Sequence, residues 1–162
     1  MTGFELAQIN IGRFHKPATD AANADFMNAL DAVNAIADMS DGFVWRLVGE
    51  GNNATDIAVS ADDPNLAVNM SVWRDVESLA AFTYRSTDHL TIMRRRREWF
   101  EHMEFYMALW WVPAGHRPTV EGGMAKVTLL SVNGSTQDAF SFRQPFAAPD
   151  GMPAHPILDE CA

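Results

Sequence analysis

The sequence predicts an α+β fold: a ferredoxin-like antiparallel sheet with helices on one face. Three observations lead to this prediction. Segments with strand and helix periodicity follow one another in the order strand, helix, strand, strand, helix, strand. The strands have hairpin-type neighbours, which favours antiparallel pairing over a doubly wound parallel sheet. The chain of 162 residues is long enough for one domain with its own core, and no linker-like stretch divides it.

The first half of the chain supplies three strands and one long helix. Residues 4–14 alternate in polarity and predict a strand, with Ala7, Ile9 and Ile11 on one side and Gln8 and Asn10 on the other. Apolar residues at spacings of three and four predict a helix from Ala22 to Met39. A strand is expected over 43–48, folding back through a turn at 49–53 into a hairpin with 55–59. Residues 66–73 alternate again and predict a further strand.

The second half supplies a bent helix, a strand and two appended elements. Helical periodicity runs from Asp75 to about Tyr84, and again from a Ser86 or Thr87 cap to roughly Met103. Residues 107–112 are apolar on both faces and predict a central, fully covered strand. A weak helix over 119–132 and a short strand over 139–143 complete one domain at residues 1–146. The Pro-rich residues 147–162 have no periodicity and are expected to form a tail that is mobile or lies against a partner subunit.

Composition excludes several classes of partner. Twelve Lys and Arg against 21 Asp and Glu give a net charge of -9, which is the wrong sign for a protein that binds phosphate backbones. We therefore expect no nucleic acid and no membrane as partners, and no stretch approaches the roughly 18 apolar residues of a membrane span. The single cysteine, Cys161, provides neither a disulfide framework nor a metal cluster. A cytoplasmic location without a bound metal is expected.

The helical segment 86–102 contains two polar residues in an apolar stripe. At about 100° per residue, His89 and Arg96 share a face with Ile92, Met93 and Phe100. Because an unpaired guanidinium is very costly to bury, Arg96 forms either a structural ion pair or a contact with an anionic ligand group. His89 is either a satisfied structural histidine or a general base or cofactor ligand.

Tryptophan is unusually frequent, and the five residues are Trp45, Trp73, Trp99, Trp110 and Trp111. Trp73 shares a strand face with Asn69, and either Trp110 or Trp111 must face the helices because neighbours on a strand point oppositely. Such residues, together with polar Asn10, could line an apolar pocket for a flat organic ligand. Alternatively, the aromatic residues fill a core and a dimer interface.

Several motifs resemble the DUF3291 family over nearly the whole chain up to about Phe146. They are Leu6-Ala-Gln-Ile-Asn-Ile-Gly-Arg13, Gly42-Phe-Val-Trp-Arg-Leu47, Asn69-Met-Ser-Val-Trp73, Phe82-Thr-Tyr-Arg-Ser-x-x-His89, Arg95-Arg-Arg-Glu-Trp-Phe100 and Leu109-Trp-Trp-Val-Pro-Ala-Gly-His116. That family is similar to the antibiotic biosynthesis monooxygenase group of the dimeric α+β barrel superfamily. The resemblance implies a homodimer of ferredoxin-like protomers packed sheet to sheet, with a pocket between sheet and helices in each.

The resemblance also implies a chemistry. Monooxygenases of this fold oxidise polycyclic phenols without a cofactor, and haem-degrading relatives use a first-strand Asn, a Trp and a His on the second long helix. Asn10 matches the first-strand Asn, and His89 resembles the Ser-x-x-His found early in that helix. The haem-ligand histidine would fall near Met93 instead of on His89. We therefore expect no cofactor, with haem as the alternative.

The sequence thus leads to the hypothesis of a small-molecule pocket protein, in the sharper form a cofactor-independent monooxygenase acting on an aromatic or polyketide-like, hydrophobic small molecule. Its predicted catalytic residues are His89, Arg96 and Asn10, and its predicted substrate-binding residues are Asn69, Trp73, Trp99 and Trp110. The alternatives are a non-enzymatic dimeric module for ligand binding or structure, and a haem-binding protein.

Overall fold

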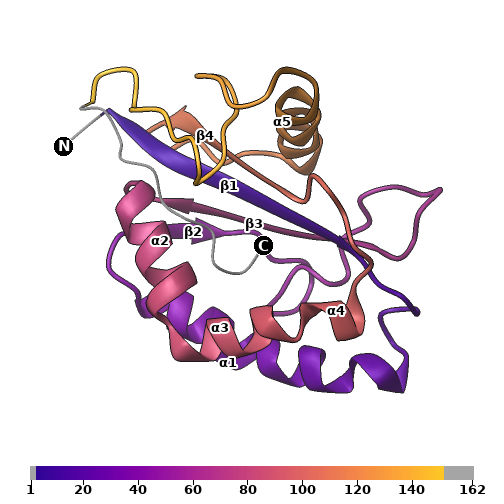
Figure 1. Ribbon diagram of the computed structural model, residues 1–162. Coiled ribbons are helices and arrows are strands. Elements are labelled where there is room, and N and C mark those ends of the chain that lie inside the picture. Colours follow the sequence, from indigo (N-terminus) through magenta and orange to yellow (C-terminus); the bar gives the residue numbers. More distant parts are fainter. Residues whose placement is uncertain (1–2, 152–162) are drawn as a thin grey trace.

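The computed structural model describes residues 3–151 and contains a four-stranded antiparallel sheet in the order β2-β3-β1-β4 (Figure 1). The elements in chain order are β1 (Phe4–Arg13), the short helix η1 (Ala21–Asn23), α1 (Ala24–Met39), β2 (Phe43–Arg46), β3 (Leu66–Trp73), α2 (Val76–Arg85), α3 (Thr87–Arg94), α4 (Arg96–Trp99), β4 (Met107–Pro113) and α5 (Val120–Asn133). This succession and this strand order are ferredoxin-like, so the predicted α+β fold class is confirmed.

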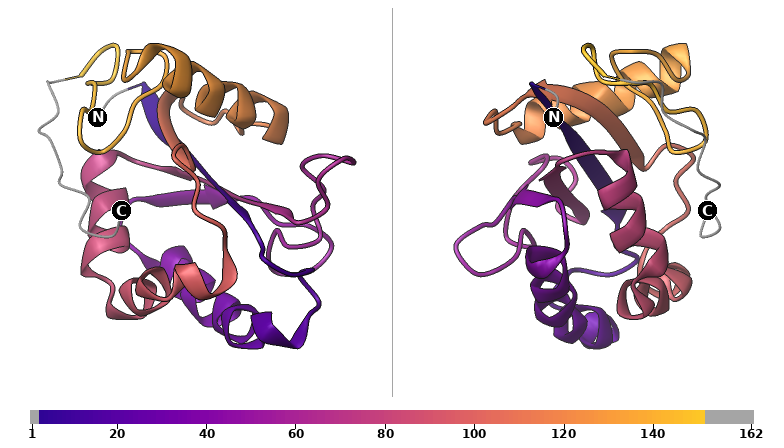
Figure 2. Two further views of the ribbon diagram at one scale, coloured as in Figure 1. Left: turned by 45° about the vertical axis from the view of Figure 1, so that its right-hand side comes forward. Right: turned by 90° about the vertical axis from the view of Figure 1, so that its left-hand side faces the viewer.

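Helices cover both faces of the sheet, which corrects the prediction of helices on one face. Helices α1 to α4 lie on one side, and α5 lies on the other (Figures 1 and 2). Val127 and Leu130 of α5 pack against the apolar side of β1 and β3. The weak helical pattern at 119–132 predicts the helix but carries no information on which face it covers.

Strand β1 is central and sets the chemistry of both faces. Its apolar residues Ala7, Ile9 and Ile11 point toward α5 and are buried. Gln8 and Asn10 point toward the other helices, because side chains alternate along a strand. Gln8 lies opposite Ser71 of β3, and Asn10 lies opposite Asn69. The register therefore gathers four polar side chains on the face that α1 to α4 cover.

The predicted hairpin between 43–48 and 55–59 is wrong. Strand β2 ends at Arg46, and residues 55–59 form turns and bends. Local side-chain hydrogen bonds replace the ladder: Asn53 Oδ1 accepts from the Thr55 backbone N–H at 3.0 Å, and Asp56 Oδ2 accepts from the Glu50 N–H at 2.8 Å. Short polar side chains compete in this way with regular strand pairing.

The helix predicted to reach Met103 breaks at Arg95 and ends at Trp99. Phe100 has an extended backbone, with φ -119° and ψ 144°, and forms a bridge with Phe14. Its ring stacks on Phe14 at 4.5 Å between centroids and meets Phe26 edge-on at 5.1 Å. Packing of this aromatic cluster therefore overrides a helical periodicity that is uninterrupted in the sequence.

Strand β4 lies at the edge of the sheet, which corrects the prediction of a central strand. Its coverage is as predicted, since Ala108, Leu109, Trp110 and Val112 are all buried. The segment predicted as a strand at 139–143 contributes a bridge between Phe140 and Leu109. An apolar run thus indicates that both faces of a strand are covered. It does not indicate how many strands pair with that strand in the sheet.

The segment after α5 returns along β4. Phe146 accepts a hydrogen bond from Trp111 Nε1 at 2.8 Å, and Ala148 is buried. The first five residues of the predicted tail, 147–151, therefore contact the domain. Its remainder, 152–162 with Cys161, lies outside the described residues.

Candidate functional site

A cavity of about 210 Å³ lies between the polar face of the sheet and helices α1 to α4. Predicted site residues from separate parts of the chain line it: Asn10, Asn69, Trp73, His89, Arg96 and Trp99. The sheet supplies the first three, and α3 and α4 supply the others. The structure thus brings these six together around one space, while the roles assigned to them stay predictions.

Trp110 does not line this cavity, contrary to the sequence-based expectation. It is 5% exposed and belongs to the apolar core under α5. In the register of the sheet, Trp110 lies opposite Ala7, whereas Trp111 lies opposite Leu6. Trp110 therefore shares the face of Ala7 and Ile9, and Trp111 points to the opposite side of the sheet, where its ring packs near Phe140.

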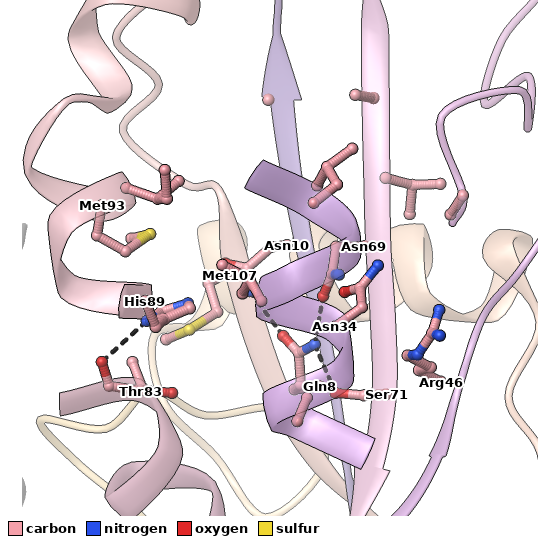
Figure 3. A pocket seen from close by; sticks show the side chains of 18 of the residues that line it. Gln8, Asn10, Asn34, Arg46, Asn69, Ser71, Thr83, His89, Met93 and Met107 are labelled. Atoms are coloured by element: carbon pink, nitrogen blue, oxygen red, sulfur yellow. Dashed lines mark hydrogen bonds between the residues drawn. The ribbon is translucent and has the colours of Figure 1, made fainter. Parts of the chain in front are cut away.

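The floor of the cavity is a network of side-chain hydrogen bonds centred on Gln8 (Figure 3). Gln8 Nε2 donates to Asn69 Oδ1 and to Ser71 Oγ, each at 2.8 Å. Gln8 Oε1 accepts from Asn10 Nδ2 at 2.7 Å. Because Gln8 is 3% exposed, these bonds offset the cost of burying its amide and fix the orientation of Asn10.

His89 lies on the opposite side of the cavity from this network (Figure 3). It stands in the first turn of α3, where its backbone N–H donates to the Ser86 cap at 3.4 Å. Its Nδ1 lies 2.9 Å from the carbonyl oxygen of Thr83. A carbonyl can only accept, so Nδ1 carries the proton and Nε2 keeps a lone pair available as an acceptor.

Burial lowers the pKa of His89 below its ordinary value, and the hydrogen bond to Thr83 opposes that shift without cancelling it. The imidazole is therefore neutral at physiological pH. The ring also lies 4.8 Å from that of Phe82. A neutral imidazole with a fixed tautomer has the state required of a general base.

Arg96 begins α4 and places a positive charge at the cavity wall. Its guanidinium carbon lies 4.5 Å from the centre of the Tyr106 ring and 5.9 Å from that of Phe100. Contact with the electron-rich ring faces stabilises a half-buried cation. Both sequence-based interpretations of Arg96, a structural ion pair and a ligand-facing arginine, are compatible with this position at the cavity wall.

The two tryptophans at the cavity are also part of the packed interior. Trp73 stacks on Phe82 with ring centroids 5.3 Å apart and donates its Nε1–H to Ser71 Oγ at 2.8 Å. Trp99 is almost fully buried, with its ring 5.4 Å from that of Phe26. Filling the core and lining a pocket are therefore not exclusive for these residues.

Sequence reasoning missed three residues that shape the site: Gln8, Ser71 and Tyr106. A signal for the first two was present, since each shares a strand face with a chosen residue, Gln8 with Asn10 and Ser71 with Asn69. What the sequence lacks is the register that places Gln8 against Ser71. Tyr106 lies just before β4 with no periodic partner, so no signal singled it out.

Metals, haem and membranes each require features that can be sought in the described residues. Within residues 3–151, no group of three or more His, Cys, Asp or Glu side chains could hold a metal ion. The cavity, at about 210 Å³, is smaller than the roughly 300–1,000 Å³ of pockets that take drug-sized ligands, and haem stays the alternative expectation. No helix of this part of the chain is long and apolar enough to cross a membrane.

Residues 5–155 match a family described as "Domain of unknown function (DUF3291)". The chain belongs to the DUF3291 family. The match covers both strands of the cavity floor and the helices that carry His89 and Arg96, so the site lies within the matched domain. No match is found among curated proteins.

Among solved structures, this DUF3291 protein is similar to several small proteins. They include a conserved protein from Methanosarcina mazei Go1 (14% identity, TM-score 0.49, covering 68% of this chain and 93% of that one). A candidate antibiotic biosynthesis monooxygenase from Nitrosomonas europaea shares 18% identity at a TM-score of 0.49, over 74% and 98% of the chains. SnoaB, a cofactor-independent oxygenase from Streptomyces nogalater, shares 18% at 0.45, over 70% and 95%. At this distance, none transfers a residue's role to the DUF3291 protein.

Proposed function

We propose that the cavity binds a small aromatic molecule with an acidic O–H group, and that the protein oxygenates this molecule without a cofactor. One observation carries the proposal. His89 is neutral, its tautomer is fixed by Thr83, and it stands in an aromatic-lined cavity opposite a polar floor. A purely structural module would fill this space with apolar side chains, as the other face of the same sheet does.

The size of the cavity narrows the substrate class. An apolar cavity of about 150 Å³ is large enough to hold benzene. The cavity here, at about 210 Å³, therefore has room for a molecule of one or two rings. Trp73 and Trp99 would contact the ring faces, and Asn69 would contact polar substituents at the edge of the floor.

The reaction would begin with removal of the phenolic proton by His89 Nε2, so that an O–H bond breaks and an N–H bond forms. Arg96 would stabilise the resulting anion electrostatically. The electron-rich anion would reduce dioxygen, and a C–O bond would form at a ring carbon that bears hydrogen. The O–O bond would then break, and the outer oxygen would leave as water with the hydrogen of that ring carbon and the proton returned by His89. One oxygen atom enters the product, a quinone, and the other leaves in the water. Asn10, held in place by Gln8, would form a hydrogen bond with the dioxygen atom that makes the new C–O bond.

A His89→Gln variant tests this function, with His102→Gln as the matched control because His102 is exposed and outside the cavity. Oxygen uptake and quinone absorbance would be followed with a panel of one-ring and two-ring phenols. We expect His89→Gln to lower kcat by about 10²–10⁴-fold and the control to keep it. Full turnover by His89→Gln at unchanged stability would remove the catalytic assignment.

A ligand-binding protein without turnover would use the same cavity. Binding of a phenol without oxygen uptake by the wild type would favour that function over the oxygenase. The homodimer also stays a prediction, and light scattering during size exclusion would test it.

A further inference from the structure

Ser71 occupies a fixed position in the cavity floor. It lies on β3 directly opposite Gln8 and is 7% exposed. Its Oγ accepts hydrogen bonds from Gln8 Nε2 and from Trp73 Nε1, both at 2.8 Å. Two donors from different positions therefore hold this oxygen at the cavity, and Figure 3 shows the bond from Gln8.

The hydroxyl of Ser71 has one hydrogen-bonding group left, its hydrogen. A serine hydroxyl has two lone pairs and one hydrogen. The N–H groups of Gln8 and Trp73 occupy both lone pairs, and in residues 3–151 Ser71 Oγ has hydrogen bonds with these two partners alone. The O–H hydrogen is thus the capacity that stays available, in a cavity where a bound molecule would replace water.

We infer that Ser71 is a specificity-determining residue, which donates its hydroxyl hydrogen to a ring carbonyl oxygen of the ligand. This inference rests on the proposed function, since it concerns the same aromatic ligand. Because Nδ1 of His89 is engaged by Thr83 and the Ser71 oxygen already accepts from Trp73, His89 Nε2 would accept a hydrogen bond from the ligand and Ser71 would donate one. A hydroxylated aromatic ketone satisfies both groups. A ligand that lacks the carbonyl leaves the Ser71 hydrogen without an acceptor, which weakens binding.

Two probe molecules of matched shape test the inference. One is a hydroxytetralone with its hydroxyl and carbonyl on opposite sides of the bicycle. The other is the corresponding tetrahydronaphthol, in which a methylene replaces the carbonyl. Their Kd values would be measured by calorimetry with the wild-type protein, with Ser71→Ala and with Ser78→Ala. Ser78 is the matched control, because it is a buried serine outside the cavity.

The wild type should bind the ketone about tenfold more tightly than the methylene analogue, the usual effect of one hydrogen bond in a buried site. In Ser71→Ala the two Kd values should become equal, and in Ser78→Ala their ratio should stay as in the wild type. The ratio distinguishes a direct contact with the ligand from a general effect on the cavity. Loss of the Ser71 oxygen as the acceptor for Trp73 and Gln8 would by itself weaken the binding of both ligands equally. An equal ratio in the wild type and Ser71→Ala would overturn the inference and leave the proposed function standing. Failure of both probes to bind the wild type would overturn both.

Discussion

The two faces of the sheet are made by the same strands and have opposite character. Under α5, residues such as Ala7, Ile9 and Met70 have no exposed surface, and apolar side chains fill the space. Under α1 to α4, the floor is polar and a cavity remains. Because side chains alternate along each strand, odd and even positions of one segment can serve packing and chemistry separately.

The polar face carries an energetic cost that the face under α5 does not. A buried amide or hydroxyl costs stability unless it is hydrogen-bonded. In residues 3–151, every buried side-chain nitrogen and oxygen has a partner, so the cost on the polar face is offset by the network around Gln8. Apolar residues would serve a structural core more simply, as they do on the face of the sheet under α5. We call that side the closed face. The polar face is therefore the one at which we expect loss of function without large loss of stability.

The largest effect is expected from Trp110→Ala on the closed face. Removing a nearly buried indole from a close-packed core should lower the free energy of unfolding by about 3–5 kcal/mol. Urea titration followed by circular dichroism would measure it. Asn69→Ala on the polar face removes one acceptor of the buried Gln8 amide and should cost less, about 1 kcal/mol, because its own side chain is exposed. Similar losses for both variants would contradict the contrast between the faces.

Two adjacent glycines of α5 offer a finer test of the closed face. A Cβ at Gly123 would lie 2.7 Å from Ile9 Cδ1 and 2.9 Å from Met70 Sδ. Overpacking of about 1–3 kcal/mol should outweigh the helix propensity gained, about 1 kcal/mol, so Gly123→Ala should lower the Tm. Gly122→Ala, which approaches Thr119 Oγ1 at 3.1 Å, should change stability by less than about 1 kcal/mol. A higher Tm for Gly123→Ala would show that the closed face has spare room.

The smallest expected effect is on the pH dependence of stability, and it comes from His89 on the polar side of the sheet. Because burial lowers the pKa of His89 from its ordinary value of 6.5, the unfolded chain binds a proton at pH values where the folded protein does not. Stability is therefore lost as the pH falls from 6.5 toward the folded pKa, and His89 has no such effect at higher pH. His89→Gln should lose less stability in that window than the wild type and His102→Gln. Identical pH profiles would contradict a buried neutral imidazole.

Much of the fold follows from periodicity, and the errors occur where tertiary contacts override it. Strands β1 and β3 and helices α1, α2 and α5 fall where the sequence predicts them. The helix break at Arg95 does not, because Phe100 leaves the helix to pack on Phe14 and Phe26. The hairpin at 55–59 fails because Asn53 and Asp56 satisfy backbone groups locally.

By itself, the sequence determined the fold class, the alternation of β1, and the helical setting of two polar residues among apolar ones, His89 in α3 and Arg96 in α4. These are local patterns, and periods of 2 and 3.6 residues suffice to read them. Only the tertiary structure decided that Trp110 faces α5, that Gln8 meets Ser71, and that a cavity remains between floor and helices. These depend on strand register and on how far helices can approach a sheet, which are set by contacts between residues distant in sequence.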